Sequence, residues 1–174
     1  MKKDGECTST WTITCRSSVS KTLLAVDLGL RTGLALFGED GRLMWYRSSN
    51  LGSRPRLRKA AYSILNEAVN VEVVAIEGGG DLAVPWMSEI DRRGLRCVQI
   101  NAERWRTSLL LSRHQRHGPD AKRHADTLAR KIIEWSGAKK PTSLRHDAAE
   151  AICIGFWAVL HVGWLEETPV EVSA

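Results

Sequence analysis

The stretch "TLLAVDLG" at 22–29 constrains the fold more than any other part of the sequence. It is a short apolar run that ends at a glycine, and this pattern predicts a buried β-strand. Similar strand patterns follow at 32–38 and 42–48, and the tight-turn sequence "GEDG" lies between them at 38–41. We therefore predict three consecutive antiparallel strands joined by tight turns.

The rest of the chain alternates between helical and strand patterns. "VEVVAIEGGG" at 71–80 predicts a buried strand that ends in an acid and three glycines, and a further strand is expected at 94–100. A short helix capped by Asn101 follows that strand, and Asp120 is expected to cap a later helix. The longer predicted helices are 54–70, 82–93, 120–136 and 143–161. This order predicts an α/β fold, in which a mixed five-stranded sheet is flanked by helices on both faces.

Length and composition indicate one globular domain. The chain has 174 residues, of which 43% are hydrophobic and 26% charged, which is enough apolar material for one core. We expect a flexible N-terminal tail at 1–20, the folded domain at 21–165 and a C-terminal tail at 166–174. No apolar run is long enough to span a membrane, and the N-terminus lacks the apolar stretch of a secretory signal. The four cysteines form no C-x-x-C pair, so reduced thiols in the cytosol are expected.

Positive charge is concentrated in two segments. The net charge is +5, yet 101–145 alone holds eleven Lys and Arg residues against four Asp and Glu residues. The second segment is "RPRLRK" at 54–59, which contains no acid. Such segments are either a solvated surface or a surface for a polyanion such as nucleic acid. Their confinement to two regions favours nucleic acid.

Four acids stand at unusual positions. Asp27 interrupts the first buried strand, Glu77 ends the strand "VVAIE", and Asp147 and Glu150 lie three residues apart on the last helix, where they share a face. A helix N-terminus also favours acids, so these last two have a simpler explanation when each is taken alone. A buried unpaired carboxylate is costly, however. Several carboxylates together suit Mg²⁺ or Mn²⁺, and two such ions about 4 Å apart can cleave a phosphodiester.

Three motifs resemble those of the RNase H-like nucleases, and especially of the RuvC-type Holliday junction resolvases. "LLAVDLGLRTGLALF" resembles the first strand pair of that family, in which an Asp ends the first strand and the second strand opens with T/S-G. "VVAIEG" resembles the second motif, and "RHDAAEAICIGFWA" resembles the acidic motif on the last helix. The match runs over roughly 22–161. Glu150 stands where bacterial RuvC usually has Asp, and D-L-G replaces D-P-G.

The resemblance implies an RNase H-like fold and a structure-specific endodeoxyribonuclease. The expected reaction is the resolution of four-way (Holliday) DNA junctions by paired symmetric nicks, in DNA recombination and repair, by a homodimer. It implies two Mg²⁺ ions per active site, with Mn²⁺ as a substitute. The expected catalytic residues and metal ligands are Asp27, Glu77, Asp147 and Glu150. His146 is a candidate assisting residue, because the family sometimes has His at the position of Asp147.

The resemblance also implies a basic surface for DNA between the fifth strand and the last helix. The candidate DNA-binding residues are Arg104, Arg106, Arg113, Arg116, Lys122 and Arg123. Trp105 either stacks on a base or belongs to the core. Two alternatives stay open: an RNase H-like or RuvX-like nuclease acting on RNA or RNA–DNA hybrids, and a non-catalytic nucleic-acid binding module. The expected location is the cytoplasm, at the nucleoid, with a phage-encoded or organellar protein as alternatives.

Overall fold

The computed structural model describes residues 20–110 and 118–173. In these residues five strands form one sheet, in the order β3-β2-β1-β4-β5. Strands β1, β2 and β3 are successively antiparallel, whereas β4 runs parallel to β1 and β5 runs parallel to β4. The strands are β1 (Thr22–Asp27), β2 (Arg31–Gly38), β3 (Leu43–Asn50), β4 (Val71–Glu77) and β5 (Arg96–Ile100). The predicted mixed five-stranded sheet is therefore confirmed.

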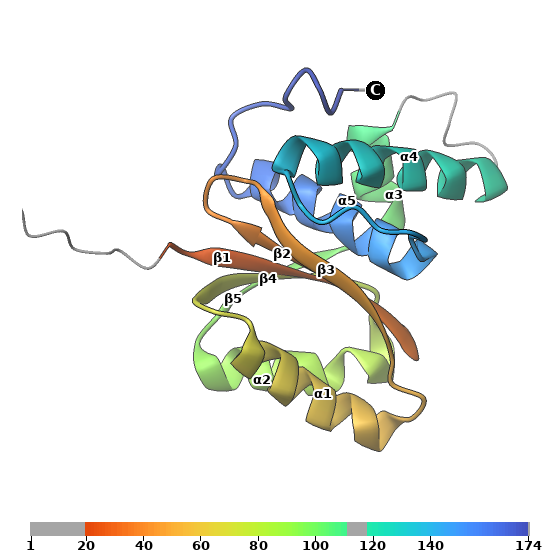
Figure 1. Ribbon diagram of the computed structural model, residues 1–174. Helices are drawn as coiled ribbons and strands as arrows, with labels where there is room; N and C mark the ends of the chain where they lie inside the picture. The colour runs from red at the N-terminus through yellow and green to blue at the C-terminus, as the bar shows by residue number, and fades with distance from the viewer. Residues whose placement is uncertain (1–19, 111–117, 174) are drawn as a thin grey trace, which may run out of the picture.

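Helices cover both faces of the sheet, as predicted (Figure 1). On one face lie α1 (Arg54–Glu67) and α2 (Val84–Arg93), and the short 3₁₀ helix η1 (Gly80–Leu82) precedes α2. On the other face lie α3 (Ala102–Leu109), α4 (Gly118–Ser136) and α5 (His146–His161). Within the described residues, no helix is long and apolar enough to cross a membrane.

The central strand β1 explains the apolar run of the sequence. Alternate side chains of β1 belong to two separate core clusters. Leu23 and Ala25 lie in the cluster shared with α3, α4 and α5, whereas Leu24 and Val26 lie in the cluster shared with α1 and α2. A strand that is covered on both faces cannot alternate between apolar and polar residues. The first polar side chain after Thr22 is therefore Asp27, at the end of the strand.

Three predicted helix starts are wrong, and the first of them is that of the helix expected at 82–93, which begins at Val84. The helix expected at 120–136 begins at Gly118, so Asp120 lies inside it and is not its cap. Pro119 explains the earlier start, because a proline is well tolerated in the first helical turn. The helix expected at 143–161 begins at His146, since Arg145 has the extended backbone of a cap residue (ψ 147°). The predicted Asn101 cap is confirmed, because its side chain accepts a 2.9 Å hydrogen bond from the Arg104 backbone N–H.

The C-terminal segment packs against the domain. Val172 is fully buried in the cluster of the α3–α4–α5 face, and Lys131 Nζ donates to the backbone oxygen of Ser173 at 2.6 Å. Of the expected N-terminal tail, all but one residue lies outside the described residues. Cys97 and Cys153 are free thiols.

Candidate active site

Two of the predicted acids meet at one edge of the sheet. Asp27 and Glu77 are the last residues of the neighbouring parallel strands β1 and β4, and they stand opposite each other in the register. The Leu28 backbone N–H donates to the Glu77 backbone oxygen at 3.0 Å, which holds the two strand ends together. Sites in open α/β sheets lie beyond the carboxyl ends of the strands. This edge is therefore where a site is expected.

Close packing brings the start of α5 to the same edge. Gly33 on β2 pairs with Asp27, and a Cβ at Gly33 would lie 1.9 Å from the Asp147 backbone oxygen. Further along α5, a Cβ at Gly155 would lie 2.2 Å from the Phe37 ring. Both glycines thus let the helix lie directly on the sheet. As a result, the first two turns of α5, which carry Asp147 and Glu150, reach the strand ends.

The pKa values of the strand acids show that the four carboxylates interact. Burial raises the pKa of Asp27 to about 8, and the charges of Glu150, Glu77 and Asp147 add to this shift. Burial also raises the pKa of Glu77, against the hydrogen bond from Trp105, and the charge of Glu150 adds to the shift. Without a bound cation, Asp27 therefore keeps its proton at neutral pH. The structure brings all four predicted acids together.

Three protein side chains hold these acids in place. Trp105 Nε1 donates to Glu77 Oε2 at 2.5 Å, and Arg106 Nη2 pairs with Glu150 Oε1 at 2.7 Å. Ser48 Oγ donates to Asp147 Oδ2.

Sequence reasoning found these three partners only in part. Trp105 is fully buried, so of its two alternative roles the structure supports the core residue and not the base-stacking one. Arg106 was expected to bind DNA, and the structure places it inside the acidic cluster. Ser48 was not predicted, because no local pattern marks a serine in the middle of a strand.

The carboxylates fit a hard divalent cation by their chemistry. In the described residues, no three His, Cys, Asp or Glu side chains are arranged so that they could hold a metal ion as they stand. Three of the four carboxylates are turned toward Ser48, Trp105 and Arg106. The donor set nevertheless consists only of carboxylate oxygens, which suits Mg²⁺ or Mn²⁺. A cation would also offset the repulsion that raises the pKa of Asp27.

The structure describes some of the predicted DNA-binding residues and not others. Arg104 is exposed, and its guanidinium lies 5.5 Å from the centre of the Trp157 ring. Arg123 is exposed on α4. Arg113, Arg116 and the side chain of Lys122 lie outside the described residues. The candidate assisting residue His146 is exposed at the first position of α5, next to Asp147.

The second basic segment lies at the same end of the sheet. The backbone N–H groups of Leu51 and Gly52 donate to the Leu30 backbone oxygen at 2.8 and 3.3 Å, so the chain enters α1 beside the β1–β2 turn. That turn follows directly after Asp27. The exposed basic side chains that begin α1 are Arg56, Arg58 and Lys59.

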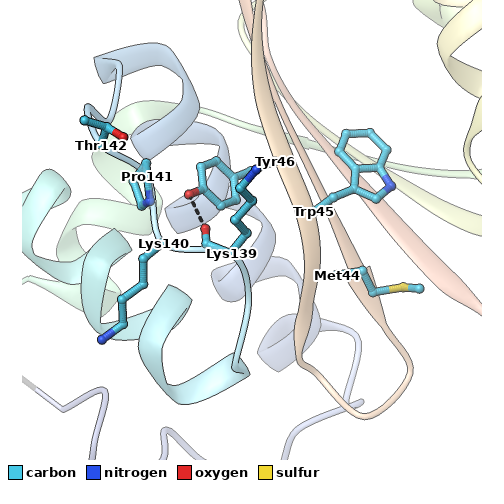
Figure 2. Close-up of a pocket in the computed structure, with 7 residues that line it drawn as sticks. All are labelled: Met44, Trp45, Tyr46, Lys139, Lys140, Pro141 and Thr142. Atoms are coloured by element: carbon cyan, nitrogen blue, oxygen red, sulfur yellow. Dashed lines mark hydrogen bonds between the residues drawn. The ribbon is translucent and has the colours of Figure 1, made fainter.

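One hollow borders an acid of the site, and another lies at β3. One of about 280 Å³ is lined by Gly78, Gln99, Ile100, Asn101 and Arg104 and so lies directly beside Glu77. The other, of about 430 Å³, lies between β3 and the loop at 139–142 (Figure 2). There Tyr46 points from β3 toward the loop, and its hydroxyl donates to the Lys139 backbone oxygen at 2.7 Å. This bond fastens the segment that leads into α5.

Comparisons with known proteins support the fold. No protein-family model and no curated protein matches the chain. Among solved structures, Thermus (T.) thermophilus RuvC in complex with a Holliday junction substrate matches with a TM-score of 0.60. The match covers 82% of this chain and 96% of that chain at 14% sequence identity. The chain has the fold of RuvC.

The RNase H-like fold inferred from the three motifs is thus confirmed. The catalytic core domain of BIV integrase also matches, at 7% identity over 80% of this chain and 82% of that chain, with a TM-score of 0.33. At 14% identity, the likeness to RuvC establishes the architecture and not the activity.

Proposed function

We propose that the chain is a metal-dependent endonuclease that resolves four-way DNA junctions. The observation that carries this proposal is the convergence of Asp27, Glu77, Asp147 and Glu150 at one sheet edge of a RuvC fold. The RuvC structure of the same fold was solved with a Holliday junction substrate. A non-catalytic binding module would not need a buried set of acids, because their charges repel a phosphate backbone and destabilise the fold.

The four carboxylates would hold two Mg²⁺ ions, with Mn²⁺ as a substitute. When bound, such ions lower the pKa of an attacking water and stabilise the leaving oxygen of the phosphodiester. Asp27 and Glu77 stand on adjacent central strands and give the site a rigid base. Asp147 and Glu150 close it from α5. Asp27 would release its proton to solvent on loading, because its carboxylate is then needed in the ionised form.

Basic residues on two sides of the acids would bind the DNA backbone. Arg104 borders the hollow beside Glu77, and the basic start of α1 stands next to the β1–β2 turn. Contacts of this kind position the phosphates and carry no sequence information. Two symmetric nicks in one junction need two active sites, so we propose a homodimer. An enzyme with this substrate would work inside the cell, where the DNA lies.

A cleavage assay on an immobile, labelled four-way junction tests this function. Matched linear duplex and RNA–DNA hybrid would be assayed in parallel, each with Mg²⁺, Mn²⁺ or EDTA. We expect paired symmetric nicks on the junction alone, and none in EDTA. Cleavage of the hybrid alone would show that the substrate is an RNA–DNA hybrid, and it would refute junction resolution.

A pair of aspartate variants separates catalysis from binding. Asp27→Asn should abolish cleavage but bind the junction about as tightly as wild type in EDTA, because Asp27 is already protonated without a cation and the substitution leaves the charge of the site unchanged. Asp91→Asn changes an exposed aspartate on α2 and should cleave normally. Equal cleavage by both variants would refute the proposed role of Asp27.

A further inference from the structure

Two consecutive residues of α3 each hold one of the site carboxylates. Trp105 donates to Glu77 at 2.5 Å, and Arg106 pairs with Glu150 at 2.7 Å. The Arg106 guanidinium also lies 5.1 Å from the centre of the Trp105 ring. One short helix thus contacts a carboxylate on the sheet and a carboxylate on α5. The Trp105 indole is neutral, whereas the Arg106 guanidinium carries a positive charge that competes with a metal ion.

Trp105 holds Glu77 without adding charge. Its side chain is fully buried, so the indole cannot swing away without opening the core. The indole N–H is a donor only, and it engages one oxygen of a carboxylate that has two. Glu77 is therefore fixed in direction, and its second oxygen is left for a cation. Trp105 has the properties of a positioning residue.

Arg106 brings a positive charge to the place where a metal would bind. Its Nη2 lies 2.7 Å from Glu150 Oε1, so its positive charge would repel a divalent cation held by the same carboxylate. Burial raises the pKa of both Asp27 and Glu77, and the charge of Arg106 offsets part of that rise and so stabilises the acidic cluster. Its side chain is 28% exposed, so it has a route to solvent that Trp105 lacks.

We propose that Trp105 and Arg106 act on metal loading in opposite directions. Trp105 positions Glu77 for the ion, whereas Arg106 is a resident counter-ion that leaves Glu150 when the ion binds. This inference rests on the proposed metal-dependent function and adds a control on how the site is filled. Neighbouring residues with opposite effects are not expected from general destabilisation, which would weaken metal binding in both cases.

Calorimetric titration of Mn²⁺ into the EDTA-stripped full chain tests the proposal. Arg106→Gln should bind Mn²⁺ about tenfold more tightly than wild type, because a competing charge is gone. Trp105→Phe should bind about tenfold more weakly, because it keeps the ring but loses the donor. Arg106→Lys keeps the charge and should stay near wild type. Arg96→Gln, which removes an exposed positive charge at the end of β5 away from Glu77, is the matched control and should also stay near wild type.

The possible results separate this inference from the proposed function. No Mn²⁺ binding by wild type would refute both. Binding by wild type with Arg106→Gln unchanged or weaker would overturn the inference and leave the metal site intact. If Trp105→Phe does not fold, the wild-type NMR signals decide. On Mg²⁺ addition the Trp105 indole N–H should stay protected from exchange with solvent while the Arg106 guanidinium protons exchange faster, and the reverse pattern would refute the assignment of roles.

Discussion

Replacing Asp27 by Asn should stabilise the metal-free protein, and by an amount that grows with pH. The pKa of Asp27 is raised from its usual 3.8 to about 8, so the folded state binds this proton more tightly than the unfolded chain. A raised carboxyl pKa contributes stability below pH 3.8, and this contribution is lost as the pH rises toward 8. Asparagine resembles the neutral acid in shape and has no proton to lose.

The expected size follows from the same pKa values. In the unfolded chain Asp27 has its usual pKa, and pH 7 lies about three units above it. Each of these pH units is worth about 1.4 kcal/mol, because the folded state keeps the proton while the unfolded chain loses it. Asp27→Asn should therefore raise the free energy of unfolding by up to about 4 kcal/mol at pH 7. At pH 5 the gain should be roughly 1.5 kcal/mol, and above pH 8 it should stop growing. The midpoint of thermal unfolding at pH 7 would rise by roughly 10 °C.

Urea unfolding in EDTA, followed from pH 5 to pH 8.5, measures this gain. Asp91→Asn is the matched control, because it replaces an exposed aspartate on α2, and it should change stability by less than about 0.5 kcal/mol. Saturating Mg²⁺ should stabilise wild type and not Asp27→Asn. A gain that does not vary with pH, or a loss at every pH, would refute the reasoning.

Three further predictions concern packing, protons and DNA. Gly33→Ala should cost about 1–3 kcal/mol of stability and most of the metal affinity, because its added Cβ would meet the backbone of α5. The control is Gly79→Ala, whose added Cβ has no atom within 4 Å and which should leave both unfolding and metal titrations unchanged. Mg²⁺ affinity should rise by up to about tenfold per pH unit as the pH approaches 8 and then level off, because Mg²⁺ binding displaces the Asp27 proton. Calorimetry in buffers of different ionisation enthalpy would count that proton. An affinity independent of pH would contradict this coupling. Junction binding by Arg56→Gln together with Arg58→Gln should show a salt dependence shallower by about 2 in log–log slope than wild type, and an unchanged slope would exclude both side chains from phosphate contact.

The strand acids could be predicted because their signals are local. A carboxylate at the end of an apolar strand is visible in one short stretch, as for Asp27 and Glu77, and parallel strands bring such ends to one edge. The spacing of Asp147 and Glu150 likewise follows from helix geometry. The mixed sheet could be predicted as well, because three successive antiparallel strands are followed by strands that alternate with helices.

The partners of the acids could not be predicted, because they depend on tertiary packing. Ser48 meets Asp147 across 99 positions of the sequence, and Trp105 meets Glu77 across 28. The importance of Gly33 was visible only as part of a family motif. Its physical reason, contact with the backbone of a helix that lies more than a hundred residues later, appears only in the folded chain. The error at Asp120 arose where a proline shifted a helix start.

The four acids differ in how firmly the fold holds them. Asp27 and Glu77 end the central strand β1 and its neighbour β4, and such inner strands are among the last parts of a domain to open in local unfolding. Asp147 and Glu150 belong to the first two turns of a helix whose cap residue, Arg145, makes no side-chain capping bond. Helix ends fray first. Warming should therefore open the α5 half of the site while the sheet is still intact, so that metal is lost and amide exchange accelerates at the start of α5 below the midpoint of global unfolding.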